Sequence, residues 1–459
     1  MASSSGPSPI LLDWITDVTG APVESARRLA AGGRRHGFLV ALVTADDPAS
    51  LYLAVEPDDE TSGDRASGLR LEADVFRRLA VDGVPVPTVV AVHPTVDAML
   101  MHVVPGDAAY SRLGEDDQER VAIDFMRCLA AAHAVDPRLD PIDGLDPGGT
   151  PRDHLLAFLD RWEKAYRDGA HGPEPVVEHG LCWLRTHVPD TDRPLAFVQG
   201  DTGPGNFMAD GGRVTAIVDW ELAHLGDPLE DIGWLSMRCA QEPFPDFPAR
   251  LAEYAAASAT ELDLAAIRYY RVLAEWTVAL IGHLKSRRGL GDAERGNAFI
   301  YEQLHRRLMV EAMIEADGSR PTDVTPLEPA DTERTWMYDM ALDQLRESVL
   351  PALDDGLPVR RTKGVARTVR LLREVDRAGR QAEARERMVL SDALGEECPD
   401  LDAARRALAE GIRASTVGPA TARHYAWTRV SLDNQLHGPA MGRLRDRHLP
   451  PLATEGDAT

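Results

Sequence analysis

The sequence that decides the fold runs from Phe197 to Trp234 and reads FVQGDTGPGNFMADGGRVTAIVDWELAHLGDPLEDIGW. Two short β-prone runs in its middle, 206–209 and 214–218, flank Asp210-Gly211-Gly212, which is typical of a tight hairpin turn. An antiparallel hairpin brings its two open ends together. The stretch therefore predicts a β-hairpin whose flanking residues lie at one place in the fold.

Three side chains with oxygen atoms lie at the open end of this predicted hairpin. Asn206 and Asp219 are expected side by side, and Asp201 precedes Asn206 by five residues across a loop whose glycines permit a tight backbone path. Each of the three alone is more often a turn residue. Their joint spacing favours a functional site, and a few hard oxygen ligands of this kind suit Mg²⁺, which completes its shell with water and phosphate oxygens.

The stretch resembles the catalytic core of the aminoglycoside phosphotransferase and choline kinase-like family, relatives of the protein kinases. The matching segments are Gln199-Gly200-Asp201, Asn206, Ile217-Val218-Asp219-Trp220 and Gly226-Asp227-Pro228. Asp-Trp-Glu-Leu-Ala and Leu-Gly-Asp-Pro are similar to the bacterial members related to kinase domains fused to acyl-CoA dehydrogenases. The resemblance covers about residues 20–315.

This resemblance implies a role for each residue of the cluster. Asp201 would accept the proton of a substrate hydroxyl, with Asn206 beside it in the catalytic loop. Asn206 and Asp219 would hold Mg²⁺ ions that bridge the phosphates of ATP or GTP. Gln199 stands where the family usually has His, and its amide is able to donate and accept similar hydrogen bonds.

The first part of the chain supplies five further candidates by resemblance. Gly32 and Gly33 resemble the turn that covers the phosphates, and Glu72 matches the helix glutamate that pairs with a phosphate-binding Lys or Arg. Met101 and Val103 resemble the hinge whose backbone groups face adenine. A plain turn and a buried edge strand remain the alternatives for the glycines and for the hinge.

The cation expected opposite Glu72 is absent from its usual strand position, where the sequence has Ala54, and no lysine precedes Lys164. A nucleotide triphosphate carries about four negative charges and binds less well without a cationic side chain. The candidates to supply the charge are Arg34, Arg35 and Arg70. Two functions stay open: an active small-molecule kinase, and a pseudokinase-type nucleotide- or ligand-binding module.

The resemblance and the sequence pattern together predict an α+β, bilobal protein-kinase-like fold with an added all-α domain. Residues 1–105 are predicted as a small β-rich nucleotide-binding lobe and 106–315 as a larger helical catalytic lobe. The Pro-, Gly- and acid-rich segment 316–334 is typical of a linker, and 335–459 is nearly all helix pattern. Basic residues recur at three- and four-residue steps over 360–380, which predicts a solvated face or a docking surface.

Composition limits the class of partner. The 459 residues carry a net charge of −24, which argues against nucleic acid and anionic membranes as partners. Four cysteines without CxxC spacing suggest neither a zinc module nor a disulfide framework. No apolar run approaches the roughly 20 residues that span a bilayer, and a cytoplasmic protein is expected. The expected partner is a small molecule with a hydroxyl group, a hydroxyacyl thioester in preference to an aminoglycoside. The sequence leaves the oligomeric state open.

Overall fold

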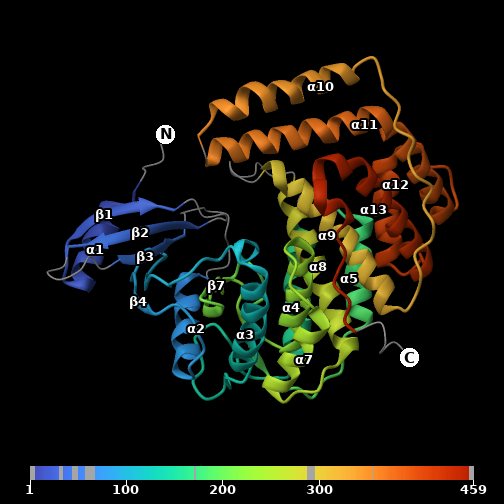
Figure 1. The fold of residues 1–459 in the computed structure, drawn as a ribbon. Coiled ribbons are helices and arrows are strands. Elements are labelled where there is room, and N and C mark those ends of the chain that lie inside the picture. Colours follow the sequence, from blue (N-terminus) through green and yellow to red (C-terminus); the bar gives the residue numbers. More distant parts are fainter. Residues whose placement is uncertain are drawn as a thin grey trace.

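The chain forms two lobes and a helical extension (Figure 1). The computed structural model describes residues 6–29, 35–43, 50–56, 68–169, 172–286, 295–354 and 356–453. It confirms the predicted bilobal α+β fold with an added helical region. No helix within these ranges is long and apolar enough to cross a membrane.

The first lobe is a five-stranded antiparallel sheet with the strand order β1-β2-β3-β5-β4. Its elements are α1 (Pro9–Thr19), β1 (Val23–Arg28), β2 (His36–Leu42), β3 (Ser50–Val55), α2 (Leu69–Val81), β4 (Val89–Val92) and β5 (Ala98–His102). Side chains alternate between the two faces of a strand. One face packs Phe38 and Leu53 against Ile15 of α1, and Ala54 on the other face joins the core around Phe76 of α2.

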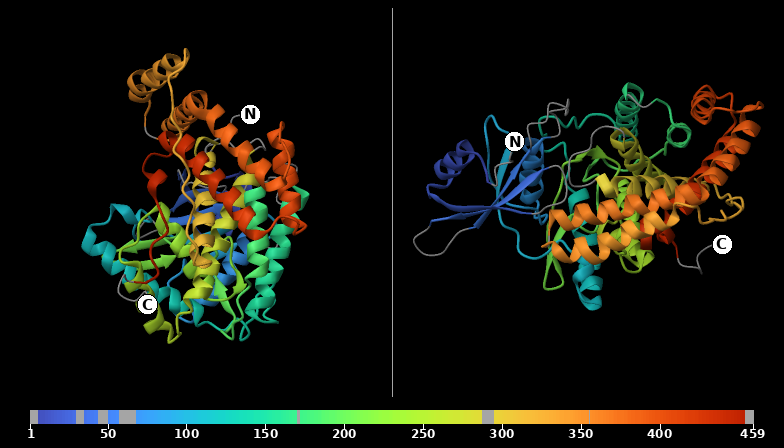
Figure 2. Two further views of the ribbon diagram at one scale, coloured as in Figure 1. Left: turned by 90° about the vertical axis from the view of Figure 1, so that its right-hand side faces the viewer. Right: turned by 90° about the horizontal axis from the view of Figure 1, so that it is seen from above.

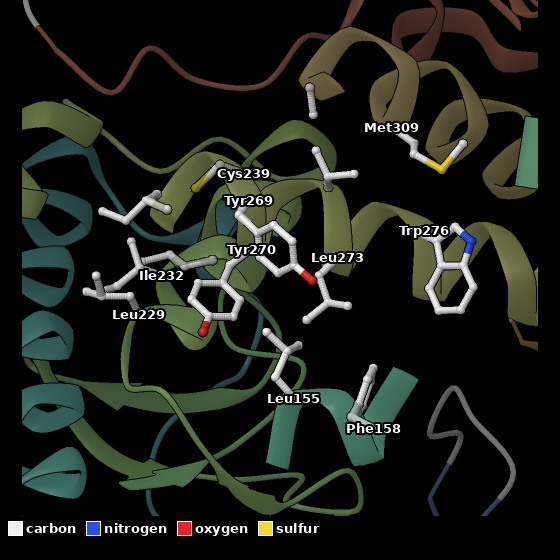
Figure 3. Packing of buried hydrophobic residues seen from close by; sticks show 14 of the residues in the cluster. Leu155, Phe158, Leu229, Ile232, Cys239, Tyr269, Tyr270, Leu273, Trp276 and Met309 are labelled. Atoms are coloured by element: carbon white, nitrogen blue, oxygen red, sulfur yellow. The ribbon is translucent and has the colours of Figure 1, made fainter. Parts of the chain in front are cut away.

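The second lobe is mainly helical, with two short antiparallel strand pairs. Its elements are η2 (Tyr110–Arg112), α3 (Glu115–His133), α4 (Pro151–Asp168), α5 (Pro175–Thr186), β6 (Ala196–Val198), β7 (Phe207–Asp210), β8 (Arg213–Ile217), β9 (His224–Gly226), α6 (Leu229–Gln241), α7 (Phe247–Ser258), α8 (Leu264–Ser286) and α9 (Arg295–Ala316). β7 pairs with β8, and β6 pairs with β9. The buried helix α8 organises this lobe: Tyr270 lies beside Leu229 and Ile232 of α6 (Figure 3), and Trp276 donates a hydrogen bond to the Val177 carbonyl at 3.0 Å.

The C-terminal helices share a core with the second lobe. They are α10 (Thr335–Gln344), η3 (Leu345–Val349), η4 (Leu350–Ala352), α11 (Leu357–Leu394), α12 (Leu401–Arg413), α13 (Pro419–Met441) and η5 (Gly442–Asp446). Leu408 and Tyr425 belong to the large core of the second lobe, and the Gln303 amide donates to the Val430 carbonyl at 3.0 Å. The extended segment after α9 is held on these helices, since the Leu327 amide donates to the Gln435 side chain at 2.7 Å.

Backbone contacts fix the two lobes against each other next to the β7–β8 hairpin. The Ile217 amide donates to the Pro85 carbonyl at 2.7 Å, and Asp107 pairs with Ala209 in both directions at 3.1 Å. Gly106 has a φ of +101°, and a Cβ on it would lie 2.2 Å from the Ala209 carbonyl oxygen. Glycine is therefore required where the chain passes from one lobe to the other.

Candidate active site

The structure contains the predicted hairpin and brings the predicted cluster together. Phe207 pairs with Ile217, and the Val218 amide donates to the Asn206 carbonyl at 3.0 Å, one residue before Asp219. The Asn206 side-chain amide donates to the Asp201 carboxylate at 2.8 Å and to the Asp201 carbonyl at 2.6 Å. The side-chain oxygen of Asn206 is thereby left facing away from Asp201.

A fully buried carboxylate holds the loop that carries Asp201. Asp231 of α6 accepts hydrogen bonds from the amides of Gln199 and Gly200 at 2.8 and 3.0 Å, and from the Thr202 hydroxyl. Its other contact is His133 Nε2 at 3.1 Å. Burial alone would raise the pKa of Asp231, but these hydrogen bonds lower it below its usual value, so the anion is stable there.

Gln199 fixes the other side of the hairpin. Its buried amide donates to the Val218 carbonyl at 2.6 Å and lies 3.5 Å from the Asp219 carbonyl. Asp219 has a φ of +61°, the left-handed region that non-glycine residues rarely adopt. The amide of Gln199 therefore supports the backbone at a residue in a strained conformation.

Asp219 has the properties of an incomplete cation site. Its carboxylate makes no hydrogen bond or ion pair with any residue that the structure describes. Desolvation, followed by the negative charge of Glu72, raises its pKa to about 6. The pKa of Asp201 is also raised, chiefly by burial, although Arg238 and Asn206 oppose the shift. Within the described ranges, no three His, Cys, Asp or Glu side chains form a metal cluster. The donors in the predicted cluster are the carboxylates of Asp201 and Asp219 and the side-chain amide of Asn206.

The cation opposite Glu72 is Arg35, which lies directly before β2. Gly37 of β2 lies opposite Ala54 of β3, so Arg35 is near the end of β3 that carries Ala54. Its Nη1 lies 2.5 Å from the Glu72 carboxylate, and its Nε donates to Glu56 at 2.9 Å. Arg35 Nη2 makes no hydrogen bond within the described part of the chain and is therefore available to an anion.

The ion pair of Arg35 is linked to the hairpin. Glu72 is 4% exposed, and its second oxygen accepts the Trp220 amide at 2.9 Å, one residue after Asp219. Burial raises the pKa of Glu72 and the Arg35 charge opposes that shift. Arg35 also lies 3.5 Å from Glu221 in the second lobe. The pair thus spans the junction where a nucleotide phosphate would meet Asp219.

A second arginine, Arg238 of α6, lies beside the loop that carries Asp201. Its Nη2 donates to the Pro204 carbonyl at 2.6 Å, and its Nη1 lies 3.8 Å from the Asp201 carboxylate. Gly203 (φ +144°) and Gly205 (φ +95°) leave room for it, since a Cβ on either would lie within 2.8 Å of the Arg238 side chain. The glycines of the loop therefore seat a guanidinium next to Asp201.

The remaining predicted positions lie around the first lobe. Met101 is buried in β5 opposite Tyr52, and Val103 follows that strand and is 43% exposed. Gly32 and Gly33 lie outside the described residues, as does Arg34. Arg70 donates to the His93 carbonyl at 3.1 Å instead of pairing with Glu72.

Sequence reasoning missed Arg238 and Asp231, because both lie on α6, whose sequence shows only the pattern of a buried helix. The signal that would have pointed to Asp231 is the adjacent pair of acids Glu230 and Asp231 among the apolar residues of α6, since charged residues are rarely buried without partners. Arg238 is also a charged residue of α6, but its position beside Asp201 depends on the path of a loop more than thirty residues earlier.

Comparison with known proteins agrees with this geometry. A model described as "Phosphotransferase enzyme family" matches residues 28–276. Acyl-CoA dehydrogenase family member 10 of Mus musculus is 29% identical over 180 residues, which are 37% of this chain and 16% of that protein. Acyl-CoA dehydrogenase family member 11 of Rattus norvegicus is 33% identical over 132 residues, which are 28% of this chain and 17% of that protein. The match thus spans less than a fifth of either relative.

A solved structure shares the fold. It is a protein of Ralstonia eutropha provisionally described as an aminoglycoside phosphotransferase, with a TM-score of 0.54 and 22% identity. The similarity covers 69% of this chain and 99% of that one. About a third of this chain therefore lies outside a match that includes almost the whole of the other structure.

Proposed function

The chain belongs to the phosphotransferase enzyme family, and on this premise we propose that it uses Mg²⁺ and ATP or GTP to phosphorylate a hydroxyl of an acyl thioester or a related small molecule. The observation that carries the proposal is the hydrogen-bonded pair of Asp201 and Asn206 next to the unpartnered Asp219 carboxylate. Phosphoryl transfer needs little covalent work from a protein, so positioned carboxylates and cations suffice.

Asp201 acts on the acceptor. Its carboxylate takes the proton of the substrate hydroxyl as the new oxygen–phosphorus bond forms, and the bond between the γ-phosphorus and the bridging oxygen breaks to release the nucleoside diphosphate. The hydrogen bond from Asn206 fixes the orientation of this carboxylate. A group that mainly orients the attacking hydroxyl needs no strongly shifted pKa.

Asp219 and the side-chain oxygen of Asn206 would hold the metal ion. When bound, Mg²⁺ supplies positive charge to the phosphate oxygens. The donor set fits, because a carboxylate with a raised pKa and no protein partner is stabilised by a cation. The buried Gln199 keeps this carboxylate in place through the Val218 carbonyl.

Two arginines take the place of a lysine as the cationic groups of the site. We assign Arg35 to the nucleotide phosphates, since its Nη2 has no described partner and Glu72 and Glu56 hold the rest of the guanidinium. Arg238, whose Nη1 lies 3.8 Å from the Asp201 carboxylate, is assigned to the charge that develops on the transferred group. Met101 and Val103 would provide the backbone groups next to the base.

The acceptor class rests on the relatives. Asp-Trp-Glu-Leu-Ala at 219–223 is similar to kinase domains joined to acyl-CoA dehydrogenases, and the curated matches bear the name of that enzyme family. A hydroxyacyl thioester is therefore preferred over an aminoglycoside.

The test is an acceptor screen with the full chain. Mg²⁺ and ATP or GTP are incubated with hydroxyacyl-CoA thioesters of several chain lengths and, as a comparison class, with aminoglycosides, and products are identified by mass spectrometry. We expect a hydroxyacyl thioester to gain one phosphoryl group in wild type and not in Asp201→Asn. Turnover of aminoglycosides alone would overturn the acceptor class, and equal turnover by Asp201→Asn would overturn the catalytic assignment.

A further inference from the structure

The helical arm formed by α10, η3 and η4, residues 335–352, has no buried apolar side chain. The structure describes all of these residues, and only Thr335 among them is buried. Trp336, Met337 and Met340 have exposed fractions of 58%, 48% and 48%. In Figures 1 and 2 the arm lies along α11 and stands off the rest of the molecule.

An arm of this kind lacks the packing that normally stabilises a helix, since most helical stability in proteins comes from a buried apolar face. Trp336 and Met340 lie on one side of the helix because they are four residues apart. They line a shallow groove together with Asp343 and Glu347. Proteins that expose contiguous large apolar side chains commonly bind another protein there.

The adjoining half of α11 also carries exposed apolar side chains. Val365, Leu372 and Val375 are exposed, with fractions between 44% and 52%. Arg373 of α11 pairs with Asp339 of α10 at 2.7 Å, which holds the two helices together as one hairpin. Both helices of this hairpin therefore present apolar side chains to solvent.

The charges of the hairpin are sorted by helix. Asp343 and Glu347 lie on the arm and share a single arginine of the arm as their ion-pair partner. Arg360, Lys363 and Arg370 lie on α11 and make no ion pair with a described residue. Cationic side chains in the first turns of a helix interact unfavourably with the positive end of the helix dipole. An acidic partner would therefore stabilise the N-terminal end of α11.

We propose that the α10–α11 hairpin is the interface for a second copy of this chain. In a twofold arrangement the same patch is used by both copies, so the acidic arm of each copy faces the basic α11 of the other. In this arrangement Trp336 and Met340 of both copies lie at the centre of a four-helix bundle. The two opposite charge patterns on one hairpin fit a copy of itself better than a partner of a single charge.

The size of the hairpin fits a dimer interface. An arm of this length is about 27 Å long, and two packed helices are roughly 20 Å wide, so each copy offers a footprint on the order of 500 Å² before surface relief is counted. Two such footprints bury about 1,000 Å² in total, which is near the lower limit for a specific protein–protein interface.

Sedimentation velocity of the full chain, from about 1 to 100 μM, tests the proposal. We expect a dimer of twice 50.1 kDa. The double variant Trp336→Ser with Met340→Ser is expected to weaken dimerisation about 100-fold or more. Met388→Ser removes an equally exposed side chain, 66%, from the other half of α11 and serves as the matched control. A wild-type monomer at every concentration, or equal loss of dimer in the control, would overturn the proposal.

Charge reversal tests the arrangement separately from the apolar contacts. One variant carries Asp343→Lys and Glu347→Lys, and the other carries Lys363→Glu and Arg370→Glu. Each alone is expected to be monomeric because like charges meet, whereas an equimolar mixture is expected to form a heterodimer. Circular dichroism checks that both variants fold. Two folded variants that fail to associate when mixed would overturn the twofold pairing of α10 with α11.

Discussion

Arg35 provides the sharpest test of the proposed nucleotide site, because it lies directly before β2 and supplies the cation opposite Glu72. The perturbation is Arg35→Met, which keeps an apolar stem of similar length and removes the guanidinium. In the wild type this group contacts Glu72 at 2.5 Å and Glu56 at 2.9 Å and leaves Nη2 for a phosphate.

The structure allows two effects of Arg35→Met to be estimated, one on nucleotide affinity and one on the free energy of unfolding. A hydrogen bond to a charged group contributes about 1.5–3 kcal/mol, so loss of the Arg35–phosphate contact should weaken nucleotide binding by roughly 10- to 100-fold. Removal of one partner from a buried ion pair costs about 3–5 kcal/mol. Arg35 is 17% exposed and Glu72 keeps its bond from the Trp220 amide, so the loss in unfolding free energy should be smaller, about 1–3 kcal/mol.

The assay is isothermal titration calorimetry with Mg²⁺·ATP, with thermal unfolding as the companion measurement. Arg70→Met is the matched control, because Arg70 bonds the His93 carbonyl and does not reach Glu72. Adding Ala54→Lys to Arg35→Met should restore affinity, since the new lysine would occupy the family position on the adjacent strand. Unchanged nucleotide affinity in Arg35→Met, or an equal loss in Arg70→Met, would refute the reasoning.

Three further outcomes follow from the same geometry. Arg238→Met should lower kcat by about 100-fold with little change in the affinity for Mg²⁺·ATP, which rapid-quench kinetics and calorimetry separate; a loss confined to nucleotide affinity would contradict the placement beside Asp201. Asp219→Asn should abolish the stabilisation of the chain by Mg²⁺·ATP in thermal unfolding, and retained stabilisation would exclude Asp219 as a ligand. The pKa of Asp219 is raised from 3.8 to about 6 in the folded protein, so its carboxylate destabilises the metal-free chain as pH rises through 6. The metal-free Asp219→Asn variant should therefore have a higher Tm than the wild type near neutral pH, and this difference in Tm should disappear below pH 3.8. A difference in Tm that does not depend on pH would contradict the raised pKa.

The hairpin and its cluster were predictable because local signals coincide there. Asp210-Gly211-Gly212 fixes the turn, the flanking strands fix the register, and the register places Asn206 beside Asp219. The capping box of α4 is equally local: Thr150 and Asp153 exchange hydrogen bonds at 3.2 and 2.9 Å. Where one short segment determines the geometry, sequence is sufficient.

The cations of the site were not predictable in the same way. That Arg35 reaches Glu72 depends on the pairing of Gly37 with Ala54, which joins two strands that are separate in the sequence. From the sequence, the candidate partners of Glu72 were Arg34, Arg35 and Arg70. Which of them pairs with Glu72 depends on how the strands of the first lobe are paired in the fold. Arg238 depends in addition on the room left by two glycines in another segment.

The C-terminal region shows a different limit of the sequence. Its Pro- and Gly-rich approach has the composition of a free linker, but the Trp427 side chain donates to the Thr322 carbonyl at 2.7 Å and the Leu327 amide to Gln435. The composition of this segment predicts that it forms no helix or strand, but it does not predict whether the segment contacts the rest of the protein. The contacts with α5 and α9 follow from apolar faces whose partners lie far away in the sequence.

The most direct measurement of the central claim is the release of nucleoside diphosphate by the full chain with a hydroxyacyl thioester present, with and without Mg²⁺. If Asp201, Asn206 and Asp219 form one phosphoryl-transfer centre, release should require the metal, match the phosphorylated product mole for mole, and fall by at least about 1000-fold in Asp201→Asn, while that variant still binds nucleotide. Release that persists at the wild-type rate in the variant, or without the metal, would contradict the claim.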